Sequence, residues 1–244
     1  MFYEETYRIT PRDTDPFGQC RPSSLLTILQ EAATDAAAQL HASRAEIVEK
    51  YNCFWMLARI WYRLDKPLCW GEELTVRTWH RGGKGAVMYR DFDLYCNDEQ
   101  IGEAVSTWVL ADLDTHKLKR MSEISEFELT TGGDLCKSIQ LHKVRLPAEM
   151  TPVEERLMHY SDTDINVHVN NTRYADFACD AIRLDQLGEG KFVSSLQISF
   201  LKECRAGEII TLSAGQQDGV WYAGGKDSTG IERFDAAISL KNIP

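Results

Sequence analysis

The sequence Asp162-Thr163-Asp164 repeats Asp13-Thr14-Asp15 from the first part of the chain, and this repeat decides the fold. Each copy is followed closely by a segment whose apolar residues recur at helical spacing. These residues are Leu25, Ile28, Leu29, Ala32, Ala33, Ala36 and Leu40 in the first segment, and Tyr174, Phe177, Ala178, Ala181 and Ile182 in the second. Both copies predict a loop that leads into a helix, and we expect the second helix to end near Gly188.

Alternating, β-prone runs follow each predicted helix. They are Phe54–Leu64, Leu74–His80, Val87–Cys96 and Ala104–Leu113 in the first half, and Val193–Leu201, Ile209–Ser213, Val220–Ala223 and Ile231–Leu240 in the second. A Gly-Glu pair precedes the second run of each series, at Gly71-Glu72 and Gly207-Glu208. The two halves therefore match beyond the aspartates.

One long helix followed by consecutive strands predicts an α+β domain, because the helix must bury its apolar face against a sheet. Two copies predict a tandem hotdog fold, in which a curved antiparallel sheet wraps around each helix. The stretch from Ser125 to Pro152 contains Thr130-Thr131-Gly132-Gly133 and little periodicity, which is typical of a linker. We expect an N-terminal domain over residues 1–124, a linker over 125–152 and a C-terminal domain over 153–244.

The composition limits the classes of partner. The 244-residue chain has a formal net charge of −10, which disfavours nucleic acid and anionic membrane surfaces. The chain lacks the apolar run of about 20 residues that a membrane-spanning helix needs. Two groups of basic residues are either solvated strand and loop ends or a local docking patch. They are Arg77, Arg81, Lys84 and Arg90, and Lys117, Lys119 and Arg120.

The N-terminus and the cysteines predict a cytoplasmic location. The first residues, MFYEETYRIT, lack the basic and apolar regions of a signal peptide and the arginines of a transit peptide. The seven cysteines show no CxxC pair or regular spacing, which disfavours a disulfide framework and a zinc site. The histidines outside the second loop also lack ligand spacing, so we predict no metal site and treat them as structural or exposed.

The two loops differ in their chemistry. When the aspartates are aligned, Phe17 corresponds to Asn166 and Gln19 corresponds to His168. The first copy has therefore lost a titratable histidine and an amide, which predicts one working site per chain. Asp164, Asn166 and His168 alternate, so in an extended segment their side chains would point together. The helix start near Asn170 and Asn171 would favour negative charge on a substrate oxygen, as an oxyanion site does.

The run Asp164-x-Asn166-x-His168-Val169-Asn170-Asn171, followed by Tyr174, resembles the active-site motif of the acyl-acyl carrier protein thioesterase family. Phe200-Leu201-Lys202-Glu203-Cys204 resembles the second motif of that family, in which a Glu-Cys pair ends a strand. The resemblance covers nearly the whole chain. It implies a tandem hotdog fold with catalysis in the C-terminal half and acyl-chain selection in the N-terminal half.

The resemblance implies a catalytic network of Asp164, Asn166, His168 and Glu203, with acyl carrier protein as partner and no cofactor. We expect Glu203 to activate water, because a carboxylate in an apolar cleft gains basicity. His168 and Asn166 would orient the water and the thioester. Cys204 is an alternative nucleophile. Neighbours in a strand face opposite ways, so Glu203 and Cys204 cannot both address His168 without a bulge.

Other functions stay open at this point. An acyl-CoA thioesterase shares the fold, and a non-catalytic acyl-binding protein would keep the cleft without turnover. A hotdog hydratase is disfavoured, because its Asp-x-Asn-Pro-x-His pattern differs from the spacing of Asn166 and His168. Two fused units supply the pairing that single-hotdog proteins obtain by dimerising, so both a monomer and a homodimer of tandem chains are compatible with the sequence.

Overall fold

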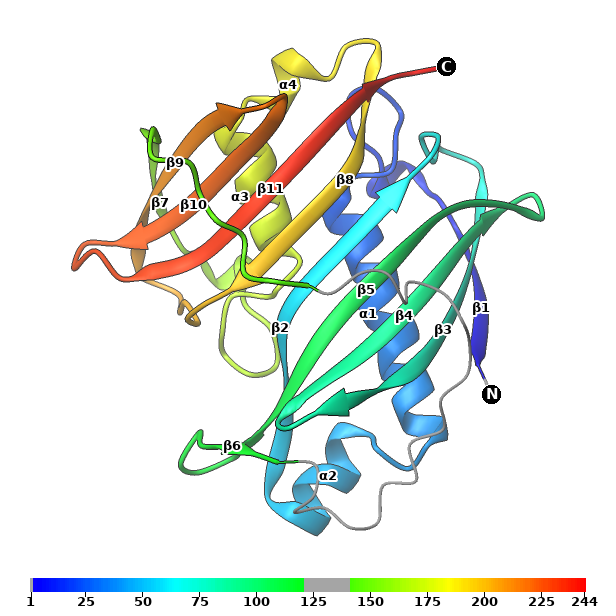
Figure 1. Ribbon diagram of the computed structural model, residues 1–244, viewed down its shortest axis with the longest axis vertical. Helices are drawn as coiled ribbons and strands as arrows, with labels where there is room; N and C mark the ends of the chain where they lie inside the picture. Colours follow the sequence, from blue (N-terminus) through cyan, green and yellow to red (C-terminus); the bar gives the residue numbers. More distant parts are fainter. Residues whose placement is uncertain (1, 121–140) are drawn as a thin grey trace.

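A computed structural model describes residues 2–120 and 141–244, so most of the predicted linker lies outside the described residues (Figure 1). The first half contains β1 (Tyr3–Arg8), α1 (Pro22–Gln39), α2 (Arg44–Tyr51), β2 (Cys53–Leu64), β3 (Glu73–Lys84), β4 (Val87–Cys96), β5 (Glu99–Asp112) and β6 (Leu118–Lys119). The second half contains β7 (Thr151–Leu157), α3 (Arg173–Ala181), α4 (Leu184–Leu187), β8 (Lys191–Phe200), β9 (Ile209–Gln217), β10 (Val220–Asp227) and β11 (Glu232–Asn242). The repeated order of loop, helix and strands is the α+β tandem hotdog fold that the sequence predicts.

The described strands form one antiparallel sheet. Its order is β1-β3-β4-β5-β2-β8-β11-β10-β9-β7, with β6 paired to β5. The halves join where β2 pairs with β8, from Arg59 opposite Ser199 to Arg63 opposite Ser195. Figure 1 shows α1 and α3 behind the sheet, on the same face. The two wrapped helices therefore share one continuous sheet.

Both helices bury their apolar faces in a common core. Pro22 occupies the first helical turn of α1, where its missing N–H costs nothing, and Leu25 and Leu29 are almost fully buried. Phe177 of α3 is equally buried and belongs to the same cluster. Burial of each such side chain contributes about 1.5–3 kcal/mol, so this shared core ties the halves together.

The second helix is shorter than predicted. It ends at Ala181, and Arg183 then adopts a left-handed conformation with φ 58° before the four residues of α4. The prediction of one helix running to Gly188 was wrong because the apolar spacing continues across this break. Helix α2 and the strands β1 and β7 were not predicted. β1 and β7 lie at the sheet edges and are largely exposed, so they lack the alternation of a half-buried strand.

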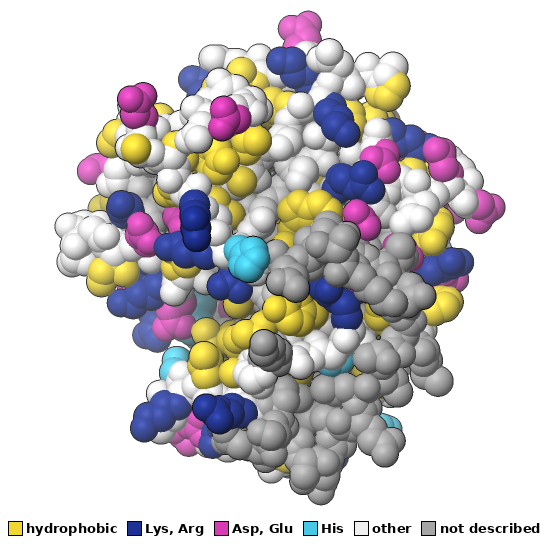
Figure 2. Space-filling view, viewed as in Figure 1, with side chains coloured by type: hydrophobic (Ala, Val, Ile, Leu, Met, Phe, Trp, Pro, Cys, Tyr) yellow, Lys and Arg dark blue, Asp and Glu magenta, His cyan; other side chains and the backbone are white. Residues whose placement is uncertain are grey.

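The basic residues between 77 and 90 are mostly paired or buried. Arg77 forms an ion pair with Glu4, and Arg81 lies 2.9 Å from Asp91. Arg90 is only 7% exposed. Figure 2 shows the outer face of the sheet, where positive and negative side chains are interspersed. This stretch therefore does not supply a free basic docking patch through these three arginines.

Candidate active site

The loop before α3 is held in shape by its own backbone. Asp164 N donates to the carbonyl of His168 at 2.8 Å, and Val167 N donates to the carbonyl of Asp164 at 3.0 Å. Val169 N donates to the carbonyl of Cys204 at 2.8 Å, which holds the loop against the segment after β8. The two motifs of the sequence are therefore neighbours in the structure.

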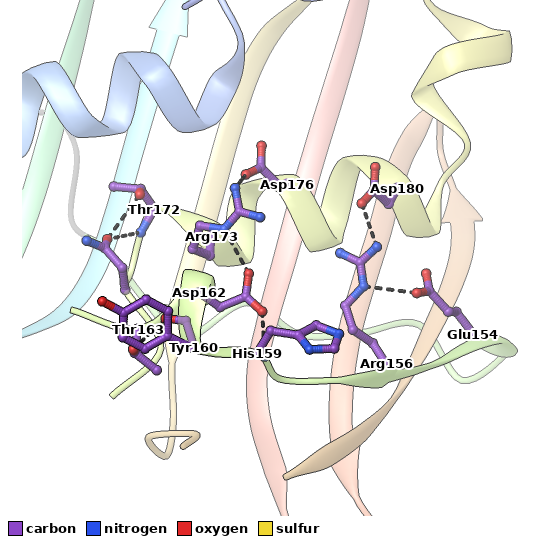
Figure 3. A network of polar contacts seen from close by, with 11 residues as sticks. Glu154, Arg156, His159, Tyr160, Asp162, Thr163, Thr172, Arg173, Asp176 and Asp180 are labelled. Atoms are coloured by element: carbon purple, nitrogen blue, oxygen red, sulfur yellow. Dashed lines mark hydrogen bonds and ion pairs between the residues drawn. The ribbon is translucent and has the colours of Figure 1, made fainter. Parts of the chain in front are cut away.

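Asp162 fixes the start of this loop (Figure 3). Its carboxylate accepts from His159 N at 2.9 Å and from Arg173 Nε at 3.2 Å, and its carbonyl accepts from Asn170 N at 2.8 Å. Arg173 also contacts Asp176 at 2.5 Å on the first turn of α3. The sequence reasoning did not include Asp162 among the site residues, although its repetition as Asp13 marked it. It is a positioning residue for the loop.

His168 and Glu203 meet beside this loop. His168 Nε2 lies 3.3 Å from Glu203 Oε2, and the two side chains are 20% and 34% exposed. Arg205 approaches the other carboxylate oxygen at 3.5 Å, and the buried Arg233 donates to the carbonyl of Glu203. The carboxylate therefore lies among polar groups at the surface rather than in the apolar cleft that we expected. An imidazole and a carboxylate at this separation can together position and deprotonate a water molecule.

Asp164 and Asn166 form a second pair. The Asp164 carboxylate accepts from Asn166 N at 2.8 Å and from Asn166 Nδ2 at 3.5 Å. The segment is a turn, with Val167 at φ 64°, so the expectation of an extended approach that points three side chains together was wrong. The backbone hydrogen bonds between Asp164 and His168 hold the segment in this turn. Asn166 is exposed at its tip.

The first half also contributes to this loop. Arg44, at the first position of α2, donates from Nη2 to Asn166 Oδ1 at 3.1 Å. This contact could not be predicted, because it joins an unpredicted helix to a loop in the other half. We expect Arg44→Met to lower kcat/KM by at most about tenfold, since one exposed polar contact is lost. Steady-state kinetics would test this, with Lys50→Met on the same helix as the charge-matched control, and a larger loss in the control would contradict it.

Asn170 and Asn171 lie at the entry to α3. Asn170 Oδ1 accepts from Thr172 N at 2.9 Å and from Thr172 Oγ1 at 3.0 Å, so this side chain closes an Asx turn onto Thr172, the N-cap residue of α3. Asn171 is half-buried beside it. The helix N-terminus is thus close in sequence to His168, and its backbone dipole points toward the loop.

Cys204 faces away from the polar cluster. It is fully buried, belongs to the hydrophobic core and lies against Tyr174 of α3. Burial raises the pKa of the Cys204 thiol, which opposes thiolate formation. The pair Glu203-Cys204 follows the end of β8 at Phe200 rather than ending the strand. Even so, the two neighbours point in opposite directions, Glu203 to the site and Cys204 to the core.

The corresponding loop of the first half has the same backbone hydrogen bond and different side chains. Asp15 N donates to the carbonyl of Gln19 at 2.8 Å, as Asp164 does to His168. Gln19 Nε2 donates to the carbonyl of Lys191 at 2.8 Å, and the Phe17 ring packs so closely on Gly188 that a Cβ there would lie 2.5 Å from it. The cavity left beside Phe17 is about 20 Å³. Contacts between the halves therefore fill the place of a second site.

The turn requires a left-handed residue in both copies, at Gly18 with φ 76° and at Val167 with φ 64°. Valine is strained in this conformation, and glycine is not. We expect Gly18→Val to destabilise the protein by about 1–2 kcal/mol, because open space around Gly18 leaves backbone strain as the main cost. Urea unfolding would measure it. Gly18→Asn, which tolerates this conformation, should cost less, and equal losses would contradict the explanation.

Comparison with known proteins gives the family of the chain. The family model described as the acyl-ACP thioesterase N-terminal domain matches residues 1–126, and the model of the C-terminal domain of the same family matches residues 148–232. This chain belongs to the acyl-ACP thioesterase family. Its resemblance in the two short motifs therefore reflects family membership over most of its length.

Solved structures share the fold of this family member. An acyl-ACP thioesterase from Bacteroides thetaiotaomicron superposes with a TM-score of 0.88 at 20% identity, covering 98% of both chains. A 12:0-ACP thioesterase from Umbellularia californica gives a TM-score of 0.82 at 19% identity, covering 99% of this chain and 97% of the other. These likenesses establish the tandem hotdog fold.

The related sequences are longer and distant. An oleoyl-acyl carrier protein thioesterase from Coriandrum sativum is 23% identical over 67% of this chain and 47% of its own length. A dodecanoyl-[acyl-carrier-protein] hydrolase from Cinnamomum camphora is 21% identical over 89% of this chain and 61% of its own length. The chain thus spans about half the length of such relatives. In the described part of the chain, no helix has the length and apolar character needed to cross a membrane.

Proposed function

We propose that the protein hydrolyses fatty acyl-acyl carrier protein to free fatty acid and holo-carrier protein. The observation that carries the proposal is the contact of 3.3 Å between His168 and Glu203, made in a chain of the acyl-ACP thioesterase family. The equivalent loop in the first half has Gln19 in place of His168, so the proposal assigns one site to each chain.

In the proposed reaction Glu203 accepts a proton from water, and the resulting hydroxide attacks the thioester carbon. His168 holds the water through its imidazole, and Asp164 and Asn166 keep the loop in position. Backbone N–H groups at the start of α3, near Asn170 and Asn171, stabilise the tetrahedral oxyanion. Collapse of this intermediate breaks the C–S bond, and protonated Glu203 returns its proton to the pantetheine thiolate.

The alternative nucleophile is less well supported. A cysteine nucleophile must reach the carbonyl carbon as a thiolate, and Cys204 is fully buried against Tyr174 with its pKa raised by burial. Glu203, in contrast, is partly exposed and contacts His168. We therefore assign the chemistry to Glu203.

We also propose a role for each half of the chain and a cellular compartment for the protein. Residues 1–124 hold the degenerate site and the acyl-chain pocket, residues 125–152 connect the halves, and residues 153–244 carry catalysis. The described cysteines, Cys20, Cys53, Cys69, Cys96, Cys179 and Cys204, are free thiols, and Cys136 lies outside the described residues. Free thiols support a reducing compartment, the cytoplasm.

The decisive experiment compares substrates. Purified protein would be given matched acyl-acyl carrier proteins and acyl-CoAs across a series of chain lengths, and free thiol release would be followed. We expect a higher kcat/KM with the carrier protein at every chain length that is cleaved. A preference for CoA would assign the protein to acyl-CoA hydrolysis, and the absence of thiol release with either carrier would contradict a hydrolytic function.

A further inference from the structure

The segment that carries Glu203 is bound twice by one residue of the neighbouring strand. Arg233, the second residue of β11, accepts at its carbonyl from Leu201 N at 3.0 Å and from Lys202 N at 3.2 Å. Nη1 of its guanidinium donates to the carbonyl of Glu203. Both the backbone and the side chain of Arg233 therefore hold the three residues that follow β8.

The guanidinium of Arg233 is buried, and carboxylates balance its charge. Its side chain is 8% exposed, and Nη2 lies 2.8 Å from Asp227 Oδ2 and 3.3 Å from Glu208 Oε2. Asp227 ends β10, and Glu208 accepts from Arg205 N at 3.2 Å in the turn before β9. Hydrogen bonds, first from Thr229 and then from backbone N–H groups and Arg233, hold the pKa of Asp227 well below its usual range. Arg233 therefore joins the Glu203 segment to two neighbouring turns through charged groups.

The first half supplies an internal comparison, because its backbone has the same hydrogen bond at this place. Cys20 N donates to the carbonyl of Leu68 at 2.7 Å, as Val169 N donates to the carbonyl of Cys204 at 2.8 Å. A Gly-Glu pair begins three residues after Leu68 and three residues after Cys204. The two segments can therefore be compared residue by residue.

The first half has neither the carboxylate nor the arginine at the corresponding positions. Pro67 occupies the position of Glu203, directly before the acceptor of the shared backbone bond. Asp65 N donates to the carbonyl of Ile101 at 2.7 Å, in the way that the segment after β8 bonds to the carbonyl of Arg233. Ile101, the counterpart of Arg233, is 1% exposed and belongs to the hydrophobic core. The arginine thus occurs in the half that has the carboxylate.

An apolar pair in the first half also takes the place of the ion pair. Cys96 ends β4 as Asp227 ends β10, and it lies in the same core cluster as Ile101. A buried ion pair adds little stability compared with well-packed apolar side chains of similar volume. The first half builds the same turn without the ion pair, so stability does not explain why the second half has it.

We propose that Arg233 is a positioning residue that, together with Asp227, fixes the backbone of residues 201–203 and so holds the Glu203 carboxylate against His168. This role rests on the proposed function, in which Glu203 is the base. Hydrogen bonds between charged groups have fixed directions, which apolar contacts lack, so they suit this task. A displacement of the base by about 1 Å can lower a rate by about 100-fold.

The double variant Asp227→Asn/Arg233→Met tests the proposal through thiol release from an acyl-acyl carrier protein. The amide removes the charge and keeps the Oδ1 bonds from Thr229 N at 2.9 Å and Ile231 N at 3.0 Å, and methionine keeps an apolar side chain in the core. We expect kcat to fall about 100-fold with KM within about threefold of the parent. The thermal unfolding midpoint should stay within about 4 °C of the parent. An unchanged kcat would overturn the proposal.

Arg156→Met is the matched control, because Arg156 also bridges two carboxylates in the second half. It donates to Glu154 at 2.9 Å and to Asp180 at 2.8 Å (Figure 3). This variant should keep kcat within about threefold of the parent. A loss in Arg156→Met as large as in the double variant would mean that any lost ion pair lowers turnover, and it would contradict the proposal.

The Glu203→Gln variant separates a failure of this role from a failure of the proposed function. Because Arg233 acts through Glu203, the double variant should lower the residual rate of Glu203→Gln by less than about threefold. The full 100-fold loss in that background would mean that the two residues act independently, and it would overturn the positioning role alone. A Glu203→Gln variant with the turnover of the parent would instead contradict the proposed base.

Arg233→Lys keeps the test decisive if the double variant does not fold. The ammonium keeps the charge beside Asp227, but it lacks the planar fork that binds the Glu203 carbonyl at the same time. We then expect kcat to fall about tenfold with KM within about threefold of the parent. An unchanged kcat in Arg233→Lys would also overturn the proposal.

Discussion

Glu203→Gln is expected to lower kcat by about 10² to 10⁴-fold while the fold is retained. The amide keeps the size of the side chain and can still contact His168 across the present 3.3 Å, but it cannot accept a proton from water. Thiol release from an acyl-acyl carrier protein would give the rate, and circular dichroism would establish that the variant is folded.

The adjacent cysteine provides the matched control for this variant. Cys204→Ala removes a buried thiol from the core, so it should lower stability modestly and keep turnover within about tenfold of the parent. If Cys204→Ala abolished turnover and Glu203→Gln did not, the reaction would proceed through a cysteine nucleophile instead. The two variants together therefore distinguish general-base from covalent catalysis.

His168→Ala is the second change with a large expected effect, again a fall in kcat of about 10² to 10⁴-fold. The imidazole is the neighbour through which Glu203 and water are held, and its loss leaves the carboxylate with Arg205 at 3.5 Å. Steady-state kinetics over a range of substrate concentrations would separate a loss of kcat from a change in KM.

Gln19→Ala is the control for His168, because it changes the equivalent position of the first half. It removes the hydrogen bond to the Lys191 carbonyl, so we expect a cost of about 1 kcal/mol in stability and no large change in turnover. A loss of turnover in Gln19→Ala as great as that in His168→Ala would contradict the assignment of a single site to the second half.

The internal repeat was sufficient to predict the tandem fold, because two copies of loop, helix and strands leave few ways to bury two apolar faces. Local features were harder to predict. The break after Ala181 leaves the apolar spacing intact, and the edge strand β1 is mostly polar. Arg90 appeared to be a surface charge in the sequence, since a buried arginine departs from the usual pattern of burial.

The sequence indicated most of the candidate site and little of its geometry. The contact of His168 with Glu203 depends on the hydrogen bond from Val169 N to the carbonyl of Cys204. No local sequence pattern predicts this hydrogen bond. Arg44 reaches the site from the other half, so it carried no signal at all. Asp162 could have been identified from its counterpart Asp13, because the two aspartates occupy the same position in the repeat. In the structure each accepts a hydrogen bond from the backbone N–H of the residue three positions earlier.

The pairing of β2 with β8 has a consequence for how such a chain can evolve. A duplicated gene often keeps one working copy and discards the other. Here the first half, whose loop has Gln19 where the second half has His168, supplies the strand that pairs with β8, so deleting it would leave β8 as an unprotected edge. The first half is therefore free to change its own loop and yet cannot be lost without exposing the sheet edge of the second half.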